Sequence, residues 1–93
     1  MFLGVLNVEL HIPESGSLKS KRKVLKCLKD KIRSNFNVSV SETDHQEKWQ
    51  RALIGVACIG CDKKYINGTL SRISNLISGY HLAEIVNTEM EIW

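Results

Sequence analysis

The chain has few of the residues that mark disordered or membrane-embedded proteins. Its 93 residues include one proline and six glycines and no low-complexity tract, which argues against a disordered tail or an internal linker. No apolar run approaches the ~20 residues that a membrane-spanning helix needs. The apolar beginning lacks a basic leader and is interrupted by Asn7 and Glu9, so we predict no signal peptide. We expect a single domain over residues 1–93 and no contact with a membrane.

The chain contains only three cysteines, which is an odd number. Three Cys suit a reducing compartment better than a disulfide framework, so we expect a cytoplasmic protein. Cys58 and Cys61 form a C-x-x-C motif at a predicted strand-to-helix junction, where thiol redox motifs also occur. Cys58 also shares the parity of apolar neighbours, so a core position and a redox role both stay open. Since zinc needs four ligands and no second pair has the spacing, we expect no metal and no cofactor.

Catalytic signatures are missing as well. The chain has no G-x-x-x-x-G-K-[ST], no G-x-G-x-x-G, no H-E-x-x-H and no nucleophile elbow. Acylphosphatases are similarly small enzymes with the element order derived below, but their Gly- and Arg-containing first loop has no match in Pro13–Ser17. We therefore expect a protein that is not an enzyme.

What the chain does have is a concentrated positive charge. Residues 18–36 contain eight of the thirteen Lys and Arg and a single acid, Asp30, which gives this segment a charge of +7. The remainder contains five cations and nine acids, a charge of −4. The net charge of +3 hides this asymmetry, which predicts that one segment meets an anion.

Hydrophobic periodicity predicts six elements in the order βαββαβ. A period of two predicts strands over 2–12, 36–41, 52–59 and 83–93, and a period of 3.6 predicts helices over 18–35 and 62–78. Right-handed crossovers place both helices on one face of a four-stranded antiparallel sheet, with the first and third strands in the middle. The predicted fold class is α+β, a ferredoxin-like sandwich.

The first predicted helix carries two neighbouring stripes. At about 100° per residue, apolar side chains fill one arc and six cations follow in the adjacent arc, while Lys21 falls within the apolar arc. Four cations crowd the helix start, where the helix dipole disfavours each by about 0.3–1 kcal/mol. An arriving polyanion would reverse this effect; the alternative is a solvated face without a ligand. The predicted nucleic-acid-binding residues are Lys19, Lys21, Arg22, Lys23, Lys26, Lys29 and Arg33.

The sheet face away from the helices bears on how RNA would bind. Single-strand platforms of this topology stack bases on aromatics of the two central strands. Here those strands offer residues such as Leu3, Val5, Asn7 and Gly55, and no aromatic. We therefore expect the helix, not the sheet, to contact RNA and to read its shape. The apolar Leu3 and Val5 could instead pair two subunits into a homodimer.

A second dense polar patch covers the predicted loop 42–50 and the residue after it. Its members are Asp44, His45, Trp49, Gln50 and Arg51. The patch could form a small polar site in which Trp49 offers a stacking surface. In the alternative, Trp49 packs against the sheet edge and anchors the loop.

Three ordered segments carry a family resemblance: Ser17–Leu25, Phe36–Glu42, and Trp49–Ala52 with Gly55–Ala57. They resemble the YlxP-like family, small bacterial proteins grouped as a domain of unknown function. The resemblance implies a ferredoxin-like fold. The family's genes often lie near those of transcription-termination, translation-initiation and ribosome-maturation factors, which implies an RNA or ribosome connection but supplies no catalytic residue. Members often carry Asp or Glu where Ser20 stands, so the capping box with Ser17 is absent here.

These patterns together predict a small cytoplasmic protein that binds structured RNA or ribosomal particles through its basic first helix. The alternative is a non-catalytic, dimeric regulatory or protein-interaction module that binds a small ligand or a partner protein.

Overall fold

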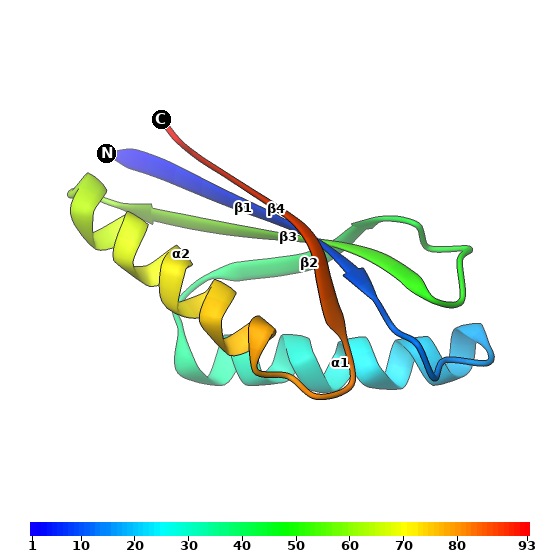
Figure 1. Ribbon diagram of the computed structural model, residues 1–93. Coiled ribbons are helices and arrows are strands. Elements are labelled where there is room, and N and C mark those ends of the chain that lie inside the picture. Colours follow the sequence, from blue (N-terminus) through cyan, green and yellow to red (C-terminus); the bar gives the residue numbers. More distant parts are fainter.

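The computed structural model describes residues 1–93 as two layers, a four-stranded antiparallel sheet and two helices that lie on one side of it (Figure 1). The elements are β1 (Phe2–His11), α1 (Leu18–Asn35), β2 (Ser39–Asp44), β3 (Arg51–Gly60), α2 (Lys63–Ser78) and β4 (Glu84–Ile92). The strand order is β2-β3-β1-β4, so β1 and β3 are central. This arrangement confirms the predicted ferredoxin-like α+β fold. Neither helix is both long and apolar enough to cross a membrane.

The core lies between the sheet and the helices. Alternate residues of the central strands point into it and are buried: Leu6, Val8 and Leu10 on β1, and Ala52, Ile54 and Val56 opposite them on β3. The helices add buried stripes at helical spacing: Leu25, Leu28 and Ile32 on α1, and Ile66, Leu70, Ile73 and Ile77 on α2. The opposite side of the sheet carries no covering layer, and we call it the open face (Figure 1).

The helix α2 approaches β1 closely at Gly4. A Cβ atom at this position would overlap Ile66 Cγ2 and lie 2.9 Å from Leu70 Cδ1. Gly4 has the core-facing parity of Leu6, so the absence of a side chain lets the helix pack directly on the strand.

The two helix starts are capped by side chains. Ser17 Oγ accepts the Ser20 N–H (3.0 Å), and Asp62 Oδ1 accepts the Lys64 N–H (2.9 Å). Asp62 is therefore the cap of α2, and the helix itself begins at Lys63, one residue later than predicted.

Two strand predictions were wrong in detail. The second strand was expected to begin at Phe36, but the Phe36 N–H donates to Ile32 O and closes α1, so β2 begins at Ser39 and continues to Asp44. The alternation that predicts the last strand sets Val86 on one face with Met90 and Ile92, which pack against the core. A bulge between Glu9 and Leu10 instead sets Ile85 opposite Leu10 and leaves Val86 exposed.

Candidate functional site

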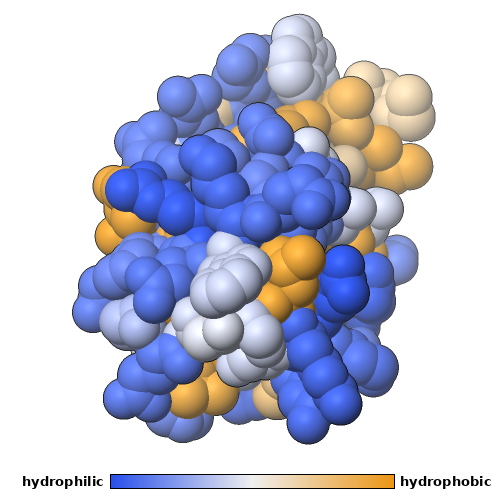
Figure 2. Space-filling model, turned by 90° about the vertical axis from the view of Figure 1, so that its right-hand side faces the viewer, coloured by the Kyte–Doolittle hydropathy of each residue, from blue (hydrophilic) through white to orange (hydrophobic).

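Six of the seven predicted RNA-contacting cations lie at the surface of α1. All are exposed except Lys29, which is half-buried. We call this set the basic face of α1: Lys19, Arg22, Lys23, Lys26, Lys29 and Arg33. Figure 2 looks at the end of the molecule where α1 begins, and hydrophilic residues cover most of that side.

The charge on this face is partly compensated towards the end of the helix. Lys26 Nζ donates to Asp30 Oδ2 (2.8 Å), which raises the pKa of Lys26 and lowers that of Asp30. Arg33 Nη2 donates to the Val40 carbonyl (2.9 Å), and Arg33 Nη1 lies 3.9 Å from Asp30 Oδ1. Since the Lys26–Asp30 ion pair is exposed, it stabilises the helix little.

The positive charge at the start of α1 is not compensated by any acid. The first turn of α1 contains no acid, and Lys19, Arg22 and Lys23 make no ion pair with any carboxylate. Three free cations thus lie beside the positive end of the helix dipole.

A shallow hollow of about 490 Å³ extends along the solvent side of α1. It is lined by Lys23, Lys26, Cys27, Asp30, Lys31 and Ser34. Because all six belong to one helix, the hollow is an open surface that an extended anion can follow, and it does not enclose a small ligand.

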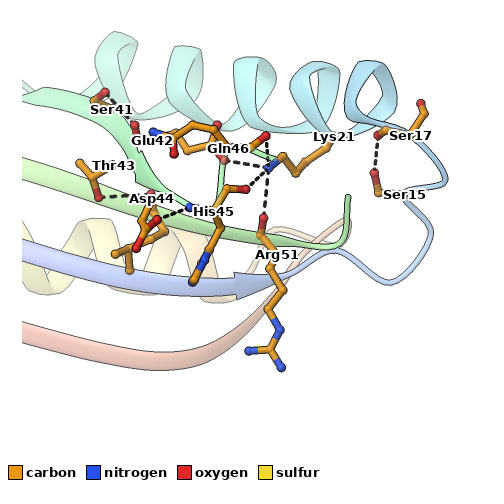
Figure 3. Close-up of polar contacts among 11 residues, drawn as sticks. Ser15, Ser17, Lys21, Ser41, Glu42, Thr43, Asp44, His45, Gln46 and Arg51 are labelled. Atoms are coloured by element: carbon orange, nitrogen blue, oxygen red, sulfur yellow. Dashed lines mark hydrogen bonds and ion pairs between the residues drawn. The ribbon is translucent and has the colours of Figure 1, made fainter. Parts of the chain in front are cut away.

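Lys21 departs from the prediction. It is fully buried, and its ammonium group donates to Glu42 Oε2 (2.9 Å) and the carbonyls of His45 (2.7 Å) and Arg51 (3.2 Å), with Gln46 O at 3.4 Å (Figure 3). Its three N–H donors are therefore used inside the protein and are not available to RNA. The reason is its place on the helix, since positions 21, 25, 28 and 32 form one buried stripe.

The partner of Lys21 was also missed from the sequence. Glu42 was read as the start of a loop, but it follows Val40 by two residues on β2 and points to the same, helix-facing side. Lys21 and Glu42 each break an apolar pattern, with opposite charges. That coincidence is the signal from which a buried pair could have been predicted.

The predicted loop patch is brought together only in part. His45 Nε2 lies 3.4 Å and Arg51 Nη1 3.2 Å from Glu9 Oε1, so these two residues meet at one carboxylate on the open face. Asp44 Oδ1 accepts the His45 N–H (2.7 Å). Trp49 is 57% exposed and therefore does not anchor the loop by packing. Gln50 Nε2 donates to Ser15 O (3.2 Å) and serves the β1–α1 turn.

His45 has a left-handed backbone, with φ 64°. This conformation costs most residues other than glycine roughly 1–2 kcal/mol. Its carbonyl accepts both Lys21 Nζ and the Lys48 N–H (3.0 Å), and these contacts hold it. The buried lysine thus fixes the loop that presents the His45 imidazole to Glu9.

Beside this carboxylate lies a polar hollow of about 320 Å³ that was not predicted. Its lining is Asn7, Glu9, His45, Leu53, Asn87 and Glu89. Amides, carboxylates and an imidazole hydrogen-bond to polar groups, but no three His, Cys, Asp or Glu are placed to hold a metal ion. The missed residues come from β1, β3 and β4, which are adjacent only after the sheet has formed.

The cysteine motif is divided between the core and the surface. Cys58 is buried on the core side of β3, whereas Cys61 is exposed, and all three Cys are free thiols. Burial raises the pKa of the Cys58 thiol. Since the thiolate is the reactive form, burial lowers the reactivity of Cys58, which packs in the core.

Comparison with known proteins gives a family and a fold. The family described as "Protein of unknown function (DUF503)" matches residues 3–90. The chain is 34% identical over 89 residues to "Uncharacterized protein YlxP" of Bacillus subtilis (strain 168), an alignment that covers 96% of this chain and 97% of that protein. Among solved structures, the de novo designed protein Foldit4 is similar in fold, with a TM-score of 0.53 and 17% identity over 100% of this chain and 94% of the design. The chain therefore belongs to the YlxP-like family of proteins of unknown function.

Proposed function

We propose that the protein binds structured RNA through the basic face of α1. The observation that carries the proposal is the helix start, where Lys19, Arg22 and Lys23 have no acidic partner. Each is disfavoured there by the helix dipole, by about 0.3–1 kcal/mol, and phosphate groups would turn this cost into a favourable contact.

The geometry favours a duplex backbone over unpaired bases. Lys19 and Arg33 are fourteen residues apart on one helix, a distance of about 21 Å at 1.5 Å per residue. A stripe of this length can contact several successive phosphates. The open face lacks aromatics on β1 and β3 for base stacking, so binding would depend on shape and backbone charge, with weak sequence preference.

A salt titration tests the proposal directly. We expect the logarithm of affinity for an RNA hairpin to fall linearly with the logarithm of salt, by about 0.9 per phosphate contacted. Six contacts would weaken binding roughly 10³-fold between 50 and 200 mM salt, measured by fluorescence anisotropy. Wild-type protein that fails to bind at low salt, or binds without salt dependence, would contradict the proposal.

A charge-reversal variant separates binding from stability. The triple change K19E/R22E/K23E should abolish RNA binding while leaving α1 as stable or more stable, because acids near the helix start are favoured by the dipole. The matched control K48E/K64E/R72E alters the net charge equally through exposed residues outside α1 and should keep most of the binding. Equal losses in both variants would mean that net charge alone, and no particular face, attracts RNA.

Co-sedimentation tests whether the same variants lose binding to ribosomal particles in a cell lysate. We expect the wild-type protein to co-sediment with ribosomal subunits at low salt and to leave them at high salt. The α1 variant should stay in the supernatant at both salt concentrations.

A further inference from the structure

The open face carries a row of exposed apolar side chains. Leu3 exchanges both backbone hydrogen bonds with Trp93 (2.8 and 2.7 Å) and lies opposite Ile59 on β3. Directly opposed residues share one face of a sheet, so these three side chains lie side by side. They are 37%, 59% and 64% exposed, in the order Leu3, Trp93, Ile59. The next row adds the half-buried Val5 and Ala57. Contiguous exposed apolar side chains of this kind are a candidate contact surface.

The two edges of the open face differ in chemistry. On the β4 edge, Glu91 lies opposite Val5 and Glu89 lies opposite Asn7. On the β2 edge, Ser39 lies opposite Ala57 and Ser41 lies opposite Gly55. The face thus has carboxylate acceptors along one edge, hydroxyl donors along the other, and an apolar row across one end.

This pattern is self-complementary under one rotation. Turning a second copy by 180° about an axis parallel to the strands sets its β4 over β2 of the first copy and its apolar row over the apolar row. Carboxylates then face hydroxyls, and strands of the two sheets run nearly aligned, as in sheet sandwiches. A half-turn about the in-plane axis perpendicular to the strands instead sets β4 over β4. The acidic edges of the two copies, which carry Glu89 and Glu91, then face each other, and polar residues cover the apolar row.

The available area suits a dimer of standard size. Four strands about 4.8 Å apart and up to about 33 Å long give a footprint of about 600 Å² per copy, or about 1,200 Å² in total. That total lies at the lower end of specific protein–protein interfaces.

We propose that two copies of this chain pair face to face through their open faces, with the row Leu3–Ile59–Trp93 packed against its counterpart and β4 of each copy above β2 of the other. The helices lie on the far side of each sheet, so both basic faces stay accessible in the dimer (Figure 1). The pairing does not depend on the RNA proposal.

The oligomeric state under point substitution tests the interface. Sedimentation velocity over a range of protein concentrations should give twice the 10.5 kDa chain mass for the wild type. Ile59→Lys should return the mass to 10.5 kDa, because it buries a charge in the apolar row. The matched control Tyr65→Lys alters a residue of similar exposure on α2, 57% against 64% for Ile59, and should remain dimeric. A wild type that is monomeric at every concentration, or an Ile59→Lys protein that still dimerises, overturns the proposal.

Cross-linking tests the orientation, in a background in which Cys27 and Cys61 are replaced by Ser. A short bis-maleimide should join S41C/E89C chains into covalent dimers, because position 41 of one copy lies over position 89 of the other. E89C alone should remain monomeric after treatment. Cross-linking of E89C to itself would place β4 over β4 and would overturn the proposed rotation.

Discussion

Lys21 connects parts of the molecule that are remote in sequence. Its ammonium group joins α1 to the end of β2 through Glu42, to the following loop through His45, and to the start of β3 through Arg51. The charge is compensated by one carboxylate and several carbonyl oxygens, which is the condition under which a buried lysine is tolerated. A basic residue counted as a ligand contact in the sequence is thus an internal support of the β2–β3 loop.

Removing this support should destabilise the protein. Lys21→Met keeps the length of the side chain but leaves the Glu42 carboxylate without its buried cation and removes a donor from the surrounding carbonyls, a change expected to cost about 3–5 kcal/mol of unfolding free energy. Urea denaturation measures it, and Lys23→Met, at an exposed position of the same helix, should shift stability by less than about 0.5 kcal/mol. Equal stabilities of the two variants would show that the buried contacts are energetically neutral.

Tyr80 makes the stability depend on pH in the alkaline range. Its hydroxyl donates to Val24 O (3.1 Å), and burial raises its pKa from 10.0 to about 12. Between these values the unfolded state loses the phenolic proton while the folded state keeps it, so the contribution of Tyr80 to stability should be constant below pH 10 and fall as the pH rises towards 12. Urea midpoints across this range should show a shallower slope in Tyr80→Phe and an unchanged slope in Tyr65→Phe. Equal slopes in all three proteins would contradict this assignment.

At the scale of elements, periodicity predicted α1 correctly from Leu18 to Asn35 and each of the other five elements at nearly its place in the chain. It failed where a single backbone hydrogen bond decides the outcome. Phe36 has the alternation of a strand, but its N–H completes the last turn of α1. Val86 has the parity of a core residue, but the bulge in the β1–β4 ladder shifts that parity. Neither event leaves a mark in the apolar pattern.

Two glycine substitutions should have opposite effects on stability. Gly4→Ala places a methyl group against Ile66 where α2 packs on β1, and it should cost about 1–3 kcal/mol. Gly68→Ala lies inside α2, where the nearest atom to the new Cβ is the flexible Arg72 Nη2 at 3.8 Å, and it should gain up to about 1 kcal/mol. Thermal or urea unfolding of both variants measures the difference, and a stabilised Gly4→Ala would mean that the β1–α2 contact can relax freely.

At the scale of the whole molecule, the uneven distribution of charge along the chain becomes a difference in charge between the helix side and the open face. The cations of α1 lie on the helix side, and Glu9, Glu89 and Glu91 lie on the open face. The helical period was enough to place six of the seven predicted cations at the surface. The same period set Lys21 in the apolar arc, but it could not supply the partner that makes burial possible, since that carboxylate belongs to β2, twenty-one residues further along the chain. The polar hollow beside His45 was missed for the same reason, because it depends on strand pairing.

The pairing of β1 also constrains how a newly made chain can fold. β1 is synthesised before the other five elements, yet its neighbours in the sheet are β3 and β4, which are synthesised after α1 and after α2 respectively. Until both have emerged, the apolar side chains of β1 have no sheet to join, whereas α1 can form from contacts within itself. β1 therefore stays without its second sheet partner until the last strand has been made.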